Sequence, residues 1–388
     1  MRYNLRLLKL LAVPLYLVAV LSLPMPWLTH PRGSPVSSQP PRRRHSASQK
    51  WKRQDSPRSG YFDRYRSTFN EASPNSSDAS YSRALIISRQ ANEEISWASI
   101  HLPHIVRHIY TTNEAGSSLH TPRNKGHEVI VYLTHLVEHY DDLADINIFM
   151  HKDRFTHHNE GLLDFDSVKM INRLRDAYVI QNGYTNLQCS WGKSCPAWLN
   201  STDTWPNIEK QEQVYLARVW QELFPGERIP TMLAAPCCAQ YAVSKERIRA
   251  IPQAEFVFFR DWLLKTPLTD YVSGRLWEYL WHYLFTGEQV RCPLEHDCLC
   301  RAYGLCFGGE EGYRDFKQLK TSKEILQREL DQRSRDEENV QRSDQRNHTS
   351  SAVERIGLVT NQIQALEHEQ KERVASAMAR GDAGLKQG

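Results

Sequence analysis

Residues 84–151 alternate between apolar segments and segments with helical periodicity, and this alternation limits the possible folds more than any other feature. Three segments predict strands: 84–88, 104–112 and 146–151. The segments between them predict helices, and in the second of these Val129, Leu133, Leu136 and Tyr140 share one helical face. A β-α-β-α-β order is typical of a parallel sheet with crossover helices. We therefore predict a single Rossmann-like α/β domain with a mostly parallel central sheet over residues 84–307.

Polar side chains follow the first and third predicted strands. The first strand is followed by Arg89, Gln90, Glu93 and Glu94, and the third by His151, Asp153, His157 and His158. In open parallel sheets, ligands bind outside the carboxyl ends of the strands. These residues are therefore candidates for a site, and the alternative is an ordinary polar transition from strand to loop.

Residues 269–287, TDYVSGRLWEYLWHYLFTG, predict a helix that is apolar around most of its circumference and hence buried. Asp270 can cap its start and Gly287 its end. Arg275, Glu278 and His282 would form one polar stripe, at i, i+3 and i+7. A buried polar stripe needs partners, so these side chains either pair with one another or line a polar pocket.

Further elements are expected downstream. Strands are predicted at 183–189 and 232–243, and helices at 209–224 and 245–251, the last capped by Ser244. Between them lies a tryptophan-rich loop that contains Trp191, Trp198 and Trp205.

All eight cysteines lie within the predicted domain: Cys189, Cys195, Cys237, Cys238, Cys292, Cys298, Cys300 and Cys306. Their spacing lacks the C-x2–4-C pairs that tetrahedral zinc sites prefer, and an even number favours up to four disulfides. We expect Cys189 to pair with Cys195, and we do not expect the adjacent Cys237 and Cys238 to pair with each other.

The N-terminal region predicts membrane attachment. Residues 10–28 carry no charge and are about long enough to cross a bilayer, after a basic cytoplasmic segment at 1–9. Residues 29–83, rich in Pro, Ser and Arg, predict a disordered stem. We expect a single-pass type II protein with its domain in the lumen of the endoplasmic reticulum or Golgi. A cleaved signal peptide and a secreted protein are the alternative.

The remaining features bear on partners. Residues 308–388 are highly charged and predict a partly helical or disordered tail. Sequons allow N-glycosylation at Asn75, Asn200 and Asn347. The net charge of +4 is too small to indicate nucleic-acid binding. A G-x-S-x-G elbow, a glycine-rich phosphate loop and an H-E-x-x-H motif are all absent from the sequence.

Several segments together resemble the domain-of-unknown-function 3431 family of fungal proteins, over about Ala84 to Cys306. They are NKGHEVIVYLTHLVEHYDDLADINIFMHKDRFTHHN, GYTNLQCSW, PCCAQYAVSKERIRAIP, SGRLWEYLWHYLF and CPLEHDCLCRAYGLC. That family in turn is loosely similar to GT-A glycosyltransferases, in which a strand ends in an Asp-x-Asp motif that binds a metal–diphosphate. This chain has His151-x-Asp153 at the matching place, which departs from the motif.

The second resemblance implies a glycosyltransferase-like enzyme that takes a nucleotide-sugar donor and a glycan acceptor. His151 and Asp153 would hold a divalent metal such as Mn²⁺, because imidazole and carboxylate ligands both suit it. The residues expected to contact substrate are Glu93, Glu94, Arg275 and Gln240. The residues expected to act in catalysis are Glu278, Asp270 and His282. The alternative is a non-catalytic domain that binds glycans or a protein through the three tryptophans of the loop.

Overall fold

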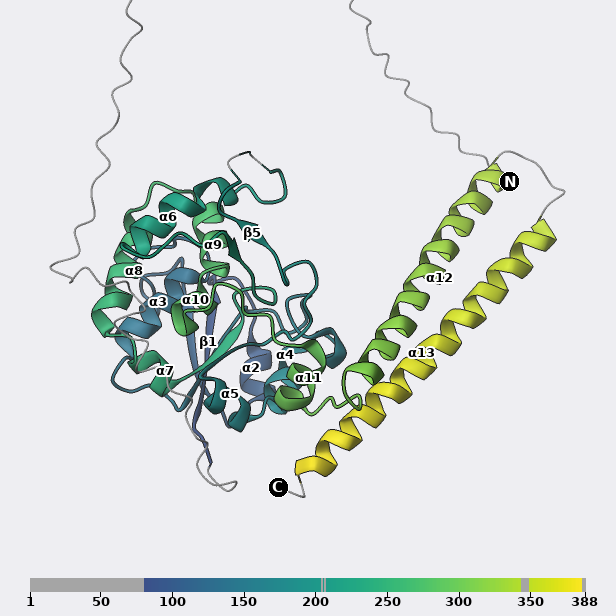
Figure 1. Cartoon of the computed structure of the whole chain (residues 1–388), viewed down its shortest axis with the longest axis horizontal. Coiled ribbons are helices and arrows are strands. Elements are labelled where there is room, and N and C mark those ends of the chain that lie inside the picture. The colour runs from purple at the N-terminus through teal and green to yellow at the C-terminus, as the bar shows by residue number, and fades with distance from the viewer. Residues whose placement is uncertain (1–79, 204, 206, 343–348, 386–388) are drawn as a thin grey trace, which may run out of the picture. The chain divides into compact units, whose positions relative to one another are not determined.

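The computed structural model describes residues 80–203, 205, 207–342 and 349–385 (Figure 1). The predicted anchor at 10–28, most of the stem, and the sequons at Asn75 and Asn347 lie outside these residues. Within the described part of the chain, no helix combines the length and the apolar character that crossing a bilayer requires. Asn200, the remaining sequon asparagine, is exposed.

A five-stranded sheet forms the centre of the fold, in the order β2-β1-β3-β7-β4. Its strands are β1 (Arg83–Arg89), β2 (Val106–Thr111), β3 (Ile146–Met150), β4 (Tyr184–Asn186) and β7 (Tyr241–Ser244). Strand β1 pairs in parallel with both β2 and β3, as the alternating pattern predicts. The sheet as a whole is mixed rather than mostly parallel, because β7 runs antiparallel to both β3 and β4.

The direction of β7 follows from where the chain enters it. Its first residue pairs with Phe149 near the end of β3, so β7 begins at the edge of the sheet where β3 ends. This arrangement brings Gln240, immediately before β7, next to His151, immediately after β3.

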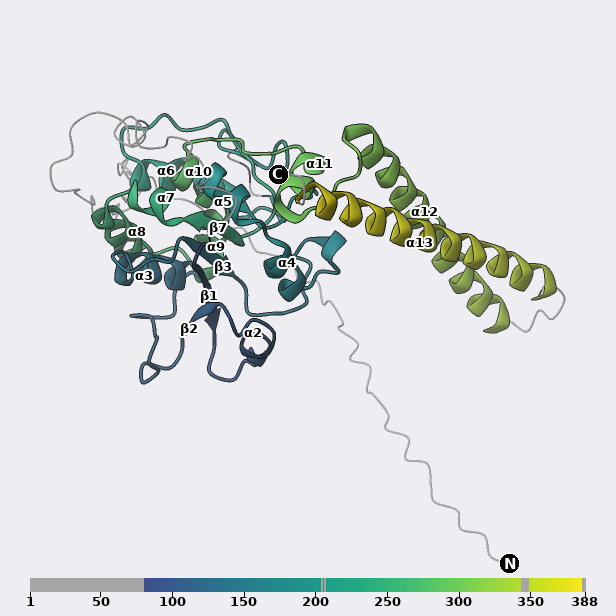
Figure 2. The ribbon, with the colours of Figure 1, turned by 90° about the horizontal axis from the view of Figure 1, so that it is seen from below.

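Helices cover both faces of the sheet. They are α2 (Ser96–His101), α3 (Val129–Glu138), α4 (Ser167–Arg173), α5 (Asp176–Asn182), α6 (Leu216–Leu223), α7 (Lys245–Arg249), α8 (Gln253–Lys265), α9 (Asp270–Glu278), α10 (Trp281–Thr286) and α11 (Glu295–Tyr303). In the described residues, 3₁₀ turns occur at Gly161–Leu163 and Gln213–Tyr215. Figure 2 shows α2 and α3 on opposite sides of β1 and β2.

Period-two alternation along the strands divides the apolar core between the two faces. Leu85 and Ile87 belong to the core beneath α2, α4, α5 and α11. Ile86, which points to the other face, belongs to the core that α3, α6, α8, α9 and α10 share. Strands β3 and β7 are buried along their whole length, which explains why their sequences are almost continuously apolar.

The helix expected over residues 269–287 is interrupted. Helix α9 ends at Glu278, and α10 begins at Trp281. Between them Tyr279 and Leu280 donate to carbonyls three residues back, so the chain tightens into a 3₁₀-like turn. Thr269, not Asp270, is the N-cap of α9, and Gly287 ends α10 in a left-handed conformation, as expected.

The strand expected over residues 232–243 is also split. Met232–Leu233 forms β6, which pairs with β5 (Leu199–Asn200) in a separate two-stranded sheet. Only the last part of the predicted strand belongs to β7, and Cys237 and Cys238 lie in the turn between β6 and β7. Ser244 caps α7 as predicted, its side chain accepting from the amide of Arg247.

All eight cysteines are paired, which confirms a disulfide-stabilised fold. The pairs are Cys189–Cys298, Cys195–Cys292, Cys237–Cys238 and Cys300–Cys306. Two expectations about connectivity were wrong. Cys189 and Cys195 each reach the segment around α11, about a hundred residues on, because folding packs the two segments together. The adjacent Cys237 and Cys238 do pair, in a turn where Cys238 has a φ of 83°.

The C-terminal segment contains two long helices, α12 (Glu310–Arg342) and α13 (Thr349–Leu385), which lie antiparallel side by side (Figure 1). Val359 and Ile363 of α13 are buried, and their spacing of four residues places them on the same face of the helix. The C-terminal end of α13 also contacts the α/β domain, where Arg173 pairs with Asp382 at 2.9 Å and Arg175 donates to the carbonyl of Gly381.

Candidate functional site

A polar cavity of about 550 Å³ lies where the parallel strands β1 and β3 end and where α3 begins. Its lining comes from the segments after β1, β2 and β3, from the residues before α3, and from the start of α9. The lining residues are Ser88, Arg89, Gln90, Glu93, Thr112, Asn124, His127, Glu128, His151, Lys152, Asp153, Thr156, His157, His158 and Asp270. The sheet thus places its cavity at the edge where open parallel sheets bind ligands.

Of the nine residues that were given a role in metal binding, substrate binding or catalysis, four line this cavity: Glu93, His151, Asp153 and Asp270. The other five do not line it: Glu94, Gln240, Arg275, Glu278 and His282. The other strand-end candidates Arg89, Gln90, His157 and His158 also line it. The convergence expected of the first and third strands is therefore present, whereas the polar stripe predicted on the buried helix does not open onto the cavity.

Lys152 stands among the acidic groups of the cavity. Its Nζ lies 3.0 Å from Asp153 Oδ1 and 3.5 Å from Glu93 Oε1. The hydrogen bond to Asp153 raises the pKa of Lys152, so its positive charge is secure at neutral pH. The indole of Trp97 donates to the Lys152 carbonyl at 2.7 Å and fixes the backbone after β3. Arg89, at the end of β1, supplies a second positive charge to the lining.

Two histidines meet at the floor of the cavity. The Nδ1 atoms of His151 and His158 lie 2.7 Å apart, so one ring donates its proton to the other. Burial lowers the pKa of each to about 4, and both rings are therefore neutral at pH 7. The Nε2 of His151 is buried without a hydrogen-bond partner in the described part of the chain, and it lies 3.9 Å from Glu128 Oε1.

The loop after β3 is held by two buried amides. Gln240 accepts from the backbone amide of His151 at 3.1 Å and donates to the carbonyl of His158 at 3.0 Å. Gln240 also donates to Asn159 Oδ1. The Nδ2 group of Asn159 donates in turn to the carbonyls of Arg154 and Phe165. Gln240 was predicted to contact substrate, but the structure places it behind the histidines, where it positions their loop.

Arg275 and Glu278 pair with each other, as the simpler interpretation of their spacing predicts. Arg275 Nη1 lies 3.2 Å from Glu278 Oε2, and Nη2 donates to Tyr279 Oη at 2.9 Å. The Tyr279 hydroxyl donates in turn to the buried Glu212. Burial raises the pKa of Glu278 to about 8, with the nearby Glu128 adding to the shift. At neutral pH Glu278 thus holds a proton.

The structure places His282 and Glu94 in other surroundings. His282 is buried, and its Nε2 lies 3.1 Å from the carbonyl of Gln289, to which it donates. The interruption between α9 and α10 separates it from Arg275 and Glu278. Glu94 is exposed, and its carboxylate accepts from the amide of Ser96 at the start of α2. A group in that position stabilises a helix start.

Sequence reasoning missed three titratable residues of the lining: His127, Glu128 and Lys152. His127 and Glu128 precede an apolar helix, a position at which polar residues are ordinary, so only the docking of α3 against β3 shows that they face the site. Lys152 lies between His151 and Asp153 and could have been included from its place alone.

The residues at the cavity can be compared with the needs of a divalent metal. The unpartnered, buried Nε2 of His151 and the carboxylate of Glu128 are an imidazole and an oxygen ligand at a separation that one cation could bridge. Asp153 is exposed and paired with Lys152. His151 and Glu128 are therefore the two side chains of this cavity that could hold a divalent cation.

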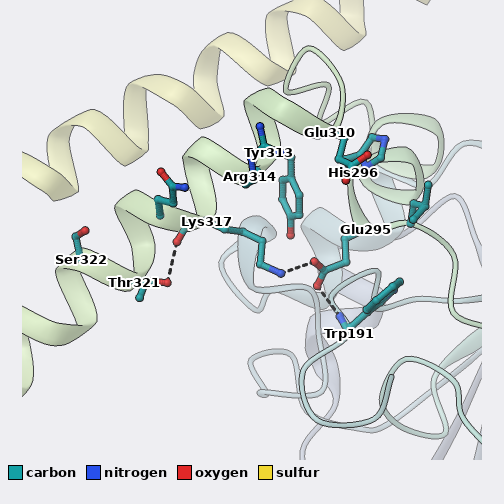
Figure 3. A pocket seen from close by; sticks show the side chains of 11 residues that line it. Trp191, Glu295, His296, Glu310, Tyr313, Arg314, Lys317, Thr321 and Ser322 are labelled. Atoms are coloured by element: carbon teal, nitrogen blue, oxygen red, sulfur yellow. Dashed lines mark hydrogen bonds and ion pairs between the residues drawn. The ribbon is translucent and has the colours of Figure 1, made fainter. Parts of the chain in front are cut away.

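A second cavity, of about 660 Å³, lies between α11 and α12 (Figure 3). Glu295 is central to it, accepting from the amide of Trp191 at 2.8 Å and pairing with Lys317 at 2.6 Å. Glu295 and Lys317 thus neutralise each other there, and this cavity shares no lining residue with the polar cavity at the ends of the parallel strands. We therefore regard it as packing space beside α12.

The three tryptophans of the loop differ in their surroundings. The Trp191 indole donates to the Pro293 carbonyl at 2.6 Å, and Trp198 stacks on Tyr279 and lies beneath Lys210. Trp205 is 80% exposed. Two of the three thus have partners within the fold.

Comparisons with known proteins extend the sequence analysis. The profile of a family described as "Protein of unknown function (DUF3431)" matches residues 85–301, which is more than half of the chain. Neither the curated proteins nor the solved structures contain a match. The matched region contains the whole five-stranded sheet after its first two residues, and every residue that lines the polar cavity. The chain therefore belongs to the DUF3431 family.

Proposed function

We propose that the polar cavity binds a nucleotide-sugar and that the protein transfers its sugar to a hydroxyl acceptor. The observation that carries this proposal is the cavity itself, in which two cations, acidic groups and histidines meet at the ends of β1 and β3. A diphosphate needs positive charge and hydrogen-bond donors, and Arg89 and Lys152 can supply both.

The same lining suggests a role for each residue in the proposed reaction. Lys152 and Arg89 would hold the diphosphate and stabilise its charge as the sugar leaves. A divalent cation held by His151 and Glu128 would supply further Lewis-acid stabilisation of that charge. Asp270 is the best-placed base to accept the acceptor's proton, since it lines the cavity while Glu278 lies outside it and is protonated at neutral pH.

The proposal is tested by calorimetric titration of the purified chain with UDP- and GDP-sugars, with and without Mn²⁺. We expect at least one donor to bind, and Lys152→Gln to weaken binding by about ten- to a hundredfold, the cost of one charge-assisted contact. Lys210→Gln is the matched control, because Lys210 lies on Trp198, outside the cavity.

Two results would count against the proposal. One is the absence of heat with every donor from a chain that is folded by circular dichroism. The other is binding that Lys152→Gln leaves unchanged. If a glycan without a nucleotide binds and Trp205→Ala abolishes that binding, the non-catalytic alternative is favoured instead.

A further inference from the structure

Three histidines form a cluster on the edge of the sheet, apart from the polar cavity. They are His108 of β2, His135 of α3 and His139 at the C-terminal end of α3. One nitrogen from each can be chosen so that all three lie within 4.8 Å of one another. The ring centroids of each pair are 4.4–4.8 Å apart. None of the three lines the cavity at the strand ends.

The fold brings these rings together by simple periodicities. His135 and His139 are four residues apart and share one face of α3. His108 and Tyr110 are two residues apart in β2, so both side chains point to the same face of the sheet. Tyr110 belongs to the core that α3 covers. Helix α3 therefore lays its histidine pair over the histidine of the edge strand.

The hydrogen bonds around the cluster leave ring nitrogens available. His139 Nδ1 lies 3.1 Å from both carboxylate oxygens of Asp142, which can only accept, so Nδ1 carries a proton. In the neutral ring, Nε2 then carries the lone pair that a metal needs. A carboxylate behind a ligating histidine is the usual way in which such a ring is oriented toward a metal.

The most telling observation is at His135, which is 1% exposed. Its Nδ1 lies 3.3 Å from the hydroxyl of Tyr110, but its Nε2 is buried without a partner in the described part of the chain. A buried ring nitrogen without a hydrogen bond costs free energy, and a bound cation would remove that cost.

We propose that His108, His135 and His139 bind a divalent first-row transition metal of the zinc class. Three imidazoles suit Zn²⁺, Co²⁺, Ni²⁺ or Cu²⁺ and do not suit Mg²⁺ or Ca²⁺, which prefer oxygen. In a tetrahedral site with Zn–N of about 2.0–2.1 Å, the ligand nitrogens lie about 3.4 Å apart, so modest rotation of the rings closes the site. His108 and His139 are only partly buried, which leaves the metal a route in. The bound ion would tie β2 to α3.

The test is zinc titration of the full chain, purified without a histidine tag, against a chelating indicator. We expect one equivalent of zinc that His108→Gln and His139→Gln each abolish. His104→Gln is the matched control, because His104 is exposed just before β2 and outside the cluster. His151→Gln separates this site from the polar cavity, and it should leave this equivalent in place.

Cobalt substitution provides a second readout. Bound Co²⁺ should give the intense visible absorption of a four-coordinate site, and the His108→Gln and His139→Gln variants should lack it. Asp142→Asn should weaken zinc binding about 10- to 100-fold and shift the cobalt spectrum, because Asp142 orients His139 without touching the metal. Equal zinc content and affinity in wild type, His108→Gln and His139→Gln would overturn the proposal, as would loss of the equivalent only in His151→Gln.

Discussion

At the scale of single residues, the polar cavity begins where the apolar side chains of β3 end, at His151 and Asp153. His151 and Asp153 could be selected because an apolar run stops immediately before them, and the structure places both on the cavity. Glu128 could not be selected, because its role depends on how α3 docks. His135 and His139 were detectable as an i, i+4 pair, but His108, a distant third member, gave no signal of its own.

At the same scale, Asp145 joins three parts of the sheet. Its carboxylate accepts from Ser82 N at 2.9 Å, Ser82 Oγ at 2.7 Å and Lys245 Nζ at 2.5 Å, which ties the starts of β1 and α7 to the turn before β3. The hydrogen bond from Lys245, followed by those from Ser82, lowers the pKa of Asp145 from 3.8 to about 2. The folded state therefore gains stability from the carboxylate above pH 3.8, and loses that gain as the pH falls toward 2.

We predict that Asp145→Asn lowers the free energy of unfolding by about 1–2 kcal/mol at pH 7, a value reduced from the pKa shift because the side chain is partly exposed. The difference from wild type should shrink steadily between about pH 4 and pH 2 in urea titrations. Asp261→Asn, which breaks a surface pair with Lys265, should change stability by less than about 0.5 kcal/mol. A difference for Asp145→Asn that is independent of pH would refute this explanation.

At the scale of elements, the parallel strands and their helices followed from periodicity, but interruptions did not. The turn at Tyr279–Leu280 divides a segment whose apolar pattern continues without a break, so its sequence alone predicts one helix. The direction of β7 is likewise a property of the chain's return path, and a four-residue apolar strand contains no signal for it.

The docking of α13 onto the α/β domain depends on a close backbone approach at Gly381. A methyl group there would lie 2.0 Å from the carbonyl oxygen of Gly304, and Arg175 donates to the Gly381 carbonyl at 2.8 Å. We predict that Gly381→Ala costs about 1–3 kcal/mol, because the backbone must move apart even though alanine favours the helix. Limited proteolysis of the helical segment should accelerate.

Gly384→Ala is the matched control, because nothing lies within 4 Å of the methyl group it would add in the same helix. It should leave proteolysis unchanged or slow it slightly. Equal protection of both variants would show that α13 does not depend on this contact.

At the scale of the whole molecule, an α/β class and a disulfide-stabilised domain were predictable, but the connectivity of the cysteines was not. Spacing along the chain favoured Cys189 with Cys195, and tertiary packing instead joins each to a residue about a hundred positions away. Two long-range bridges therefore connect the loop after β4 to the segment around α11.

We predict that Cys189→Ala/Cys298→Ala lowers the free energy of unfolding by about 3–5 kcal/mol, because that bridge closes a loop with a sequence separation of 109 residues. Cys237→Ser/Cys238→Ser should cost far less, since adjacent residues enclose almost no loop. Guanidinium unfolding of both double variants measures this difference. Similar losses in the two would contradict a loop-closure origin.

The central claim is that the ends of β1 and β3, together with the start of α3, form a site for a phosphorylated donor. It is tested most directly by a crystal structure of the chain grown with UDP and Mn²⁺. We predict density for the diphosphate within hydrogen-bonding distance of Arg89 and Lys152. Diphosphate bound in the cavity between α11 and α12, or a polar cavity that stays empty at a saturating UDP concentration, would contradict the claim.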